Sequence, residues 1–306
     1  MYLHKENKEL FRDVLSVVSE RNHVSRDIVE KDYYVTMILQ LLANEDINII
    51  FKGGTSLSKA YNVIDRFSED IDITFNEHLG EKKRKKLKYN VLKPIAEDLN
   101  LKIKNWDSIE SDKNYNHYDF YYESVIDEEF IALPSFVKVE TALMSYSFPT
   151  EKKLISNYIY DTLKDEEPEL IREYNLVPFE MSVQCINRTF IDKIFALGDY
   201  YIQNKARRNS RHLYDIYKLA PYIVIDESFL KLVKDVREHR KNIGDKIAPS
   251  ANDNVNVLQL AQEIYDTKFY EEDYYNTTLH IISDEIDYDK VIKCFIILIK
   301  KIFKNI

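Results

Sequence analysis

The sequence predicts an α+β protein in two parts, a mixed sheet flanked by helices over residues 1–150 and a helical bundle over residues 151–306. Before Pro149, short apolar runs repeatedly alternate with polar residues, which is typical of strands. After Pro149 these strand patterns fade and apolar residues recur predominantly at helical spacing. We therefore place a domain boundary near residue 150, after SFPT.

The individual elements follow from the same periodicities. Ser25 is a suitable N-cap for a helix that starts at residue 26. In the first part we expect helices at 5–22, 26–43, 56–64 and 81–99 and strands at 48–52, 71–75, 117–124 and 135–143. In the second part we expect helices at 189–204, 210–220, 227–241, 255–266 and 288–304.

Composition limits the class of protein. With 45% hydrophobic and 31% charged residues, the chain is an ordinary folded protein rather than a disordered or fibrous one. Its two cysteines, Cys185 and Cys294, argue against a disulfide framework or a cysteine zinc site and fit a reducing cytoplasm. The N-terminus lacks a signal sequence and no apolar run approaches a membrane span, so we expect a soluble, cytoplasmic protein without a membrane partner.

Charge is unevenly distributed along the chain. The net charge of −9 disfavours a general nucleic-acid coat protein. The segment from Lys193 to Lys241, however, contains 11 basic and 6 acidic residues, a net charge of +5. The segment from Tyr265 to Asp289 contains eight acidic residues and a single basic one, Lys268, a net charge of −7. A polyanion such as RNA would be attracted to the first segment and repelled by the second.

The most informative segment is FKGGTSLSKAYNVIDRFSEDIDITF. The chain has only 5 glycines, and two of them, Gly53 and Gly54, stand together after the strand at 48–52. Such a turn lets the backbone approach a bound group that any Cβ would obstruct. Thr55 and Ser56 then open a helix, whose N-terminal amides favour a phosphate.

Two carboxylates follow on the next expected strand. Asp70 and Asp72 occupy alternate positions, so both side chains leave the same face. Carboxylates beside a phosphate-binding turn are typical of a site for Mg²⁺ (or Mn²⁺), which takes oxygen ligands and bridges protein acids to substrate phosphates. The order strand, glycine pair, helix, strand with DxD resembles the nucleotidyltransferase superfamily. A P-loop and a Rossmann fingerprint are excluded because GxxxxGK[ST] and GxGxxG are both absent.

The superfamily normally adds a third carboxylate from a later strand. Glu140 in FVKVETAL is the best candidate, because Val137 and Val139 point one way and Lys138 and Glu140 the other. A solvent-facing acid paired with Lys138 is the alternative for Glu140. Asp119 is the second choice for the ligand.

The second half adds a further match. Lys193 lies on an expected helix and is followed by a basic cluster and then Asp215. The pattern GGTxLxK(x)nRxSxDID, then DK(x)2A, then R(x)nRHxxDxY, resembles the AbiEii toxin family, nucleotidyltransferase-like toxins of toxin–antitoxin and abortive-infection (antiviral defence) systems. The resemblance runs from about residue 28 to residue 220, so residues 1–150 would be a nucleotidyltransferase-like domain.

The resemblance implies roles for individual residues. Asp70, Asp72, Lys193 and Asp215 would be catalytic, with Lys193 contacting phosphates and the helical part thus contributing to the site. Asp70, Asp72 and, as third ligand, Glu140 would bind the metal. The residues implied in holding the nucleotide triphosphate are Lys52, Gly53, Gly54, Thr55, Ser56, Arg66, Ser68, Arg207 and Arg208.

Simpler roles exist for several of these residues. Asp215 follows Arg211 by four positions and so could form an ion pair along its helix. Arg66 could neutralise its acidic neighbour Asp65. Ser68 is a plausible phosphorylation site in the family, or else orients the loop that enters the DID strand. His212 is better explained as a structural residue than as a general base.

The resulting function is an NTP-dependent transfer of NMP to an acceptor hydroxyl, with the tRNA 3′ end as the acceptor class that the resemblance suggests. A small molecule or a protein side chain as acceptor, and an inactive nucleotide-binding module, are the alternatives. The resemblance also implies a cognate antitoxin encoded next door. The sequence does not reveal the NTP used, the acceptor, the oligomeric state or the role of residues 242–306.

Overall fold

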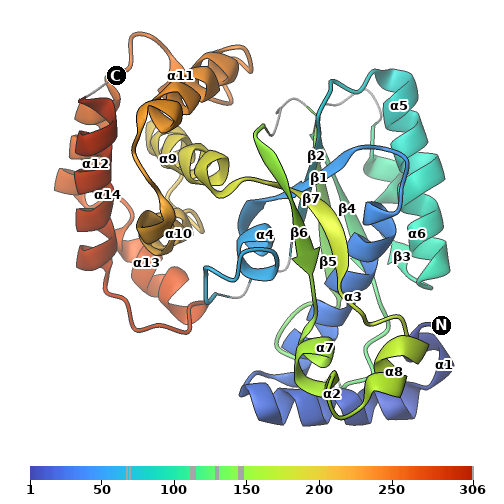
Figure 1. The fold of residues 1–306 in the computed structure, drawn as a ribbon. Helices are drawn as coiled ribbons and strands as arrows, with labels where there is room; N and C mark the ends of the chain where they lie inside the picture. Colours follow the sequence, from blue (N-terminus) through green and yellow to red (C-terminus); the bar gives the residue numbers. More distant parts are fainter. Residues whose placement is uncertain (67, 69, 111–114, 128–130, 144–147, 305–306) are drawn as a thin grey trace. The chain divides into compact units, whose positions relative to one another are not determined.

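The structure, a computed structural model, describes residues 1–66, 68, 70–110, 115–127, 131–143 and 148–304. These residues form two compact units. The first contains residues 1–61 and 68–183, and the second contains residues 62–67 and 184–306 (Figure 1). The fold is α+β, as the sequence predicts.

A seven-stranded mixed sheet organises the first unit, in the order β3-β4-β5-β2-β1-β7-β6. Its strands are β1 (Ile49–Lys52), β2 (Ile71–Phe75), β3 (Lys102–Ile103), β4 (Tyr115–Tyr121), β5 (Phe136–Ala142), β6 (Thr150–Ile155) and β7 (Phe179–Gln184). The central pairs are β1 with β2, antiparallel, and β2 with β5, parallel. The sheet therefore places β2, with Asp72, between β5, with Glu140, and β1, which leads into the glycine pair.

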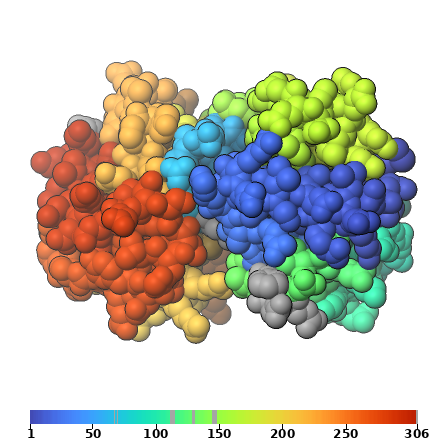
Figure 2. Space-filling model, turned by 90° about the horizontal axis from the view of Figure 1, so that it is seen from below, coloured from blue at the N-terminus to red at the C-terminus, as the bar shows by residue number. Residues whose placement is uncertain are grey.

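The helices of this unit include two that pack on the sheet, α3 against β5 and α6 against β3 (Figure 1). The unit's helices are α1 (Leu3–Glu6), α2 (Lys8–Asn22), α3 (Arg26–Ala43), α4 (Gly53–Lys59), α5 (Glu81–Lys86), the π-helical turn Leu87–Leu92, α6 (Lys93–Asp98), α7 (Tyr158–Leu163) and α8 (Pro168–Glu173). Figure 2 shows the blue N-terminal helices beside the yellow-green segment that holds α7 and α8, where Arg21 forms a bidentate pair with Glu166. One apolar core, from Leu3 to Val183, runs through the unit.

The second unit is helical among its described residues. Its helices are α9 (Ile186–Ile202), α10 (Arg211–Leu219), α11 (Glu227–Lys241), α12 (Val257–Thr267), α13 (Glu271–Asn276) and α14 (Tyr288–Phe303). Helix α10 packs against α9 and α14, and its inward face buries Leu213, Ile216 and Leu219 completely. In the described part of the chain, no helix is long and apolar enough to cross a membrane.

The strands after Pro149 are a correction to the sequence prediction. Residues 150–155 and 179–184 were expected to lie in a helical part, but they form β6 and β7 of the sheet. β7 joins the sheet by pairing in parallel with β1, Phe51 opposite Val183, a partner far away in the sequence. The division between the compact units accordingly falls at residues 183–184, whereas the sequence analysis placed a boundary near residue 150.

Candidate active site of a nucleotidyltransferase

The glycine turn lies where β1 ends and α4 begins. Gly53 has a φ of +79°, a conformation that residues with a Cβ rarely adopt. A Cβ built on Gly53 would lie 1.9 Å from Oδ2 of Asp72. Two features therefore require glycine at position 53. One is its positive φ, and the other is the Asp72 carboxylate, which occupies the space that a Cβ would fill.

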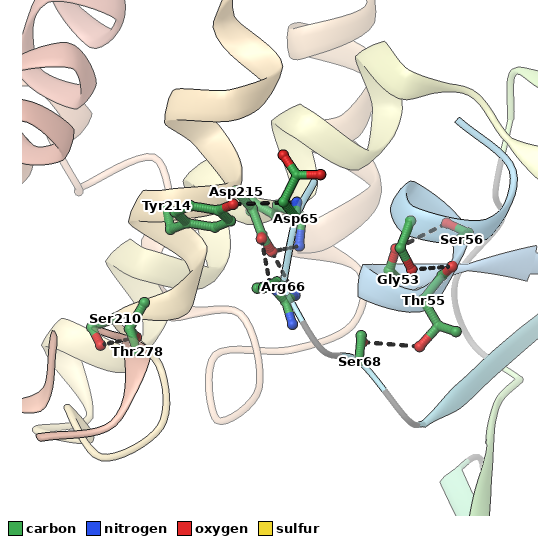
Figure 3. Close-up of polar contacts among 12 residues, drawn as sticks. Gly53, Thr55, Ser56, Asp65, Arg66, Ser68, Ser210, Tyr214, Asp215 and Thr278 are labelled. Carbon is green, nitrogen blue, oxygen red and sulfur yellow. Dashed lines mark hydrogen bonds and ion pairs between the residues drawn. The ribbon is translucent and has the colours of Figure 1, made fainter. Parts of the chain in front are cut away.

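Thr55 and Ser56 stabilise this turn with their side chains. The Thr55 hydroxyl lies 2.6 Å from the Asp70 carbonyl oxygen and 2.9 Å from the Ser68 hydroxyl, and the Ser56 hydroxyl donates to the Gly53 carbonyl oxygen at 2.9 Å (Figure 3). Both side chains belong to buried residues. They hold the loop that enters β2, and a phosphate at this turn would meet backbone amides rather than these hydroxyls.

Asp72 and Glu140 are direct neighbours across the pair β2 and β5. In the same transverse row, Lys52 of β1 lies opposite Asp72, and His117 of β4 lies opposite Glu140. Register partners point to the same face of a sheet. The row therefore runs Lys52, Asp72, Glu140, His117, with the lysine at one end, the histidine at the other and the two acids between them. Asp70 immediately precedes β2.

Tyr115 adds a hydroxyl group to the acidic side of the sheet. It begins β4 and is half exposed. The pKa of its hydroxyl is raised by burial, then by the charge of Glu140 and a hydrogen bond to it, and then by the charges of Asp72 and Asp70. Sequence reasoning missed Tyr115, since nothing distinguishes it locally from the other 22 of the 23 tyrosines.

The donor set fits a hard divalent cation. Carboxylate oxygens are what Mg²⁺ and Mn²⁺ prefer, and Mg²⁺ usually takes one or two carboxylates and completes its shell with substrate phosphates and water. Among the residues that the structure describes, no three His, Cys, Asp or Glu side chains form a group that could hold a metal ion, so Asp70, Asp72 and Glu140 are not gathered into a three-carboxylate site.

A second polar centre lies in the second unit. Asp215 on α10 accepts hydrogen bonds from Arg66 Nε at 2.6 Å and Arg66 Nη2 at 2.9 Å (Figure 3). It also accepts from Lys193 Nζ, on α9, at 2.6 Å. Asp215 is 0% exposed. The structure therefore joins three residues predicted for the site, although Arg66 and Asp215 are 149 positions apart.

Two further side chains surround this centre. Arg211 Nε and His212 Nδ1 are buried and have no hydrogen-bond partner among the described residues. The His212 ring stacks on Tyr200 with centroids 5.8 Å apart. Burial, followed by the charges of Lys193 and Arg211, holds the pKa of His212 well below its ordinary value, so the ring is neutral at physiological pH.

Arg207 and Arg208 lie apart from this buried centre. Both are exposed, and Arg208 adopts a φ of +63° while its backbone N–H donates to Asp273 at 2.7 Å. Asp273 also accepts from the Ser210 amide and hydroxyl and so fixes the loop before α10. The two guanidinium groups are consequently presented on the surface of the second unit.

A strand, a glycine turn, a helix and two neighbouring strands with adjacent carboxylates are the arrangement that the sequence analysis associates with nucleotidyltransferases. A comparison with protein families identifies the family. The family model described as "Nucleotidyl transferase AbiEii toxin, Type IV TA system" matches residues 38–292. The chain belongs to this family and is a nucleotidyltransferase toxin of a type IV toxin–antitoxin system.

Among solved structures, the chain is similar to MenT4, the nucleotidyltransferase toxin Rv2826c from Mycobacterium tuberculosis H37Rv. The two share 16% identity with a TM-score of 0.46, and the match covers 95% of this chain and 98% of MenT4. No curated protein matches the chain.

Proposed function

We propose that this toxin transfers an NMP group from an NTP to the 3′ end of tRNA, with Mg²⁺ or Mn²⁺ as cofactor. The observation that carries the proposal is the side-by-side placement of Asp72 and Glu140, with Asp72 against the Gly53 turn. A phosphate at the turn would lie next to both carboxylates. Two neighbouring carboxylates, with the single Lys52 in register beside Asp72, suit an added divalent cation.

In the proposed reaction the oxygen of the acceptor hydroxyl forms a bond to the α-phosphorus. The bond from that phosphorus to the bridging oxygen breaks, pyrophosphate leaves, and the hydroxyl proton passes to solvent. The backbone at Gly53, Gly54 and Thr55 holds the triphosphate. Asp70, Asp72 and Glu140 would hold the metal, which supplies positive charge to the reacting phosphate when bound.

Basic residues serve the two anionic substrates in this proposal. Lys193 neutralises the triphosphate, where charge develops as pyrophosphate leaves. Arg207 and Arg208 are exposed within the segment of local charge +5 and contact phosphates of the acceptor or of the NTP. The toxin acts in the cytoplasm, where NTP and tRNA are found, and its antitoxin is encoded next to it.

The proposal is tested by incubating the protein with each of the four α-³²P-labelled NTPs and total RNA. We expect label at the 3′ end of tRNA from one NTP or a subset of them. Asp72→Asn should reduce the rate at least about 100-fold, because the metal loses a charged ligand. Asp46→Asn, which changes an exposed acid of the same unit, is the matched control.

The outcomes separate the alternatives. Label that survives ribonuclease and appears on protein or on a small molecule would replace tRNA as the acceptor. Labelling by Asp72→Asn at the wild-type rate would overturn the mechanism. Tight NTP binding without pyrophosphate release in any extract would indicate a module that has lost turnover.

A further inference from the structure

The segment 62–67 belongs to the second unit, although the residues before and after it belong to the first. Both the backbone carbonyl oxygen and the backbone N–H of Asp65 form hydrogen bonds within this unit. The Ser283 N–H donates to the Asp65 carbonyl oxygen at 2.8 Å, and the Asp65 N–H donates to the Tyr214 hydroxyl oxygen at 3.2 Å (Figure 3). The next described residue after this segment is Ser68, which leads into Asp70 and β2.

The Arg66 side chain ends on Asp215 and is completely enclosed. The side chains of Arg66, Asp215 and Lys193 are exposed by 2%, 0% and 7%. Both carboxylate oxygens of Asp215 are occupied, one by Arg66 and the other by Arg66 and Lys193 together. No surface of Asp215 is left to contact a substrate or a metal ion.

The ionisation of Asp215 leads to the same conclusion. Burial alone would raise the pKa of this carboxyl, but the charges of Arg66 and Lys193 outweigh burial and hold the pKa well below its usual range. A general acid or base needs a pKa near the working pH. Asp215 remains ionised and is therefore unsuited to exchange a proton during the reaction.

We propose that Asp215 is a positioning residue rather than a catalytic one. It fixes the ammonium group of Lys193, and it locks Arg66 and with it the segment that leads to Ser68 and Asp70. Burial lowers the pKa of the Lys193 ammonium group, and the charge of Asp215 opposes that effect. Asp215 thus helps to keep Lys193 charged, and two cations on one carboxylate leave the centre with net positive charge. This inference rests on the proposed function, in which Lys193 neutralises the triphosphate of the NTP.

The test compares three variants of the full chain. Lys193→Met removes the ammonium group, and Asp215→Asn removes the charge that holds it. In the triple variant Arg66→Met/Lys193→Met/Asp215→Leu, apolar side chains replace the whole ion cluster, a change that buried clusters often tolerate without loss of stability. The triple variant therefore keeps the test valid where Asp215→Asn fails to fold.

Three measurements are made on each protein: KM and kcat for NTP, the Kd for NTP, and the Mg²⁺ concentration that gives half-maximal rate. A positioning role predicts that Asp215→Asn raises KM and Kd for NTP about 10-fold or more, as Lys193→Met does, because effects of residues acting as a unit do not multiply. The triple variant should then be no worse than Lys193→Met alone. The Mg²⁺ requirement should remain that of wild type.

The matched control is Lys218→Met. Lys218 lies on the same helix and pairs with Asp65 at 2.7 Å and Asp284 at 2.8 Å, so it anchors the same segment without contacting Asp215. We expect kcat and KM close to wild type. The control separates the loss of any anchor from the loss of the Asp215 centre.

Three results would overturn the inference. The first is a triple variant whose rate falls by the product of the separate effects. The second is a raised Mg²⁺ requirement in Asp215→Asn, as Asp72→Asn should show. The third is an Asp215→Asn protein with unchanged KM and Kd per folded molecule. A wild-type protein that transfers NMP to nothing would instead refute the proposed function, and the Kd comparison would then decide the inference alone.

Discussion

The two polar centres use acidic residues in opposite ways. In the first unit, which holds the sheet and is called the sheet unit below, Asp72 and Glu140 are only partly buried and lie next to each other. Their charges raise the pKa of Tyr115. In the helical unit, Asp215 is completely buried, and Arg66 and Lys193 lower its pKa. One centre holds an excess of negative charge and the other an excess of positive charge.

This difference supports a role in the reaction for Asp72 and Glu140 and a structural role for Asp215. A carboxylate whose charge is already balanced inside the protein contributes structure, because a ligand would have to displace a buried partner first. In the first unit, by contrast, two carboxylates lie side by side with one lysine in register beside Asp72, and neighbouring carboxylates favour a bound cation. The sheet unit is therefore expected to respond to metal and the helical unit to phosphate.

After Asp72→Asn, the largest effect is expected at Glu140. Glu140→Gln should lower the rate of NMP transfer about 100-fold, since it removes one of two neighbouring charges from the proposed metal site. Asp119→Asn is the matched change one strand away, where Asp119 lies opposite Lys138. It should leave the rate within about threefold of wild type. A stronger loss from Asp119→Asn than from Glu140→Gln would make Asp119 the third ligand.

Gly53 gives the next largest effect. Gly53→Ala places a methyl group where the Asp72 carboxylate now lies and strains a positive φ. We expect a rate reduced about 10-fold or more, with a stability loss of about 1–2 kcal/mol. Both are measurable by labelled-NTP assay and by thermal unfolding.

Gly80→Ala is the control for this substitution, because a Cβ at Gly80 meets no atom within 4 Å. It should leave both measurements unchanged. A Gly53→Ala protein that lost stability but kept its rate per folded molecule would reduce the glycine pair to a tight turn. The Asp72 carboxylate would then tolerate displacement, contrary to the role at a metal that we propose for it.

Periodicity within a short stretch of sequence predicted several strands and helices correctly. Strand 71–75 and helices 26–43 and 227–241 have the predicted bounds, because alternation or helical spacing is strong there. Asp226 caps its helix by accepting from the Phe229 amide, whereas the Ser25 hydroxyl donates to Asp27 and makes no cap hydrogen bond. β6 and β7 were missed. β7 is fixed by pairing with β1, which lies some 130 positions earlier, and no local pattern encodes a partner at that distance.

The same limit applies to the candidate site. The glycine pair and the DxD acids lie within 20 residues of one another, so the sequence linked them. For Asp215 and Arg66, sequence reasoning offered neighbours, Arg211 and Asp65, whereas the structure joins the two residues to each other. Long-range ion pairs depend on tertiary packing, which residue spacing does not reveal.

The smallest effect is expected at His4 in the first unit. A substitution there should change stability little at neutral pH and more at acidic pH. Its Nε2 lies 3.0 Å from the Leu99 carbonyl oxygen and its Nδ1 lies 2.8 Å from the Tyr33 hydroxyl. Because a carbonyl oxygen only accepts, the neutral ring carries its proton on Nε2 and accepts from Tyr33. Burial, with smaller contributions from nearby lysines, lowers the pKa of His4 to about 4.

The sign of the pH effect follows from this lowered pKa. Between pH 6.5 and about 4 the unfolded chain takes up a proton at His4 that the folded protein does not, so stability falls as pH falls through this window. By about pH 5 the loss is about 2 kcal/mol, and at neutral pH it is absent. His4→Gln keeps a donor for Leu99 and should remove this loss, seen as a smaller drop in Tm between about pH 7 and about pH 5.

His78→Gln, which replaces an exposed histidine of the same unit, is the control and should leave the drop in Tm unchanged. In the helical unit, burial also lowers the pKa of His212, so that unit loses stability in the same direction below pH 6.5. Asp215 behaves differently, because its lowered pKa preserves its contribution until the pH falls below 3.8. If His4→Gln and wild type lost Tm equally on acidification, His4 would already be protonated in the folded protein, and its hydrogen bond to Tyr33 would have to reverse direction.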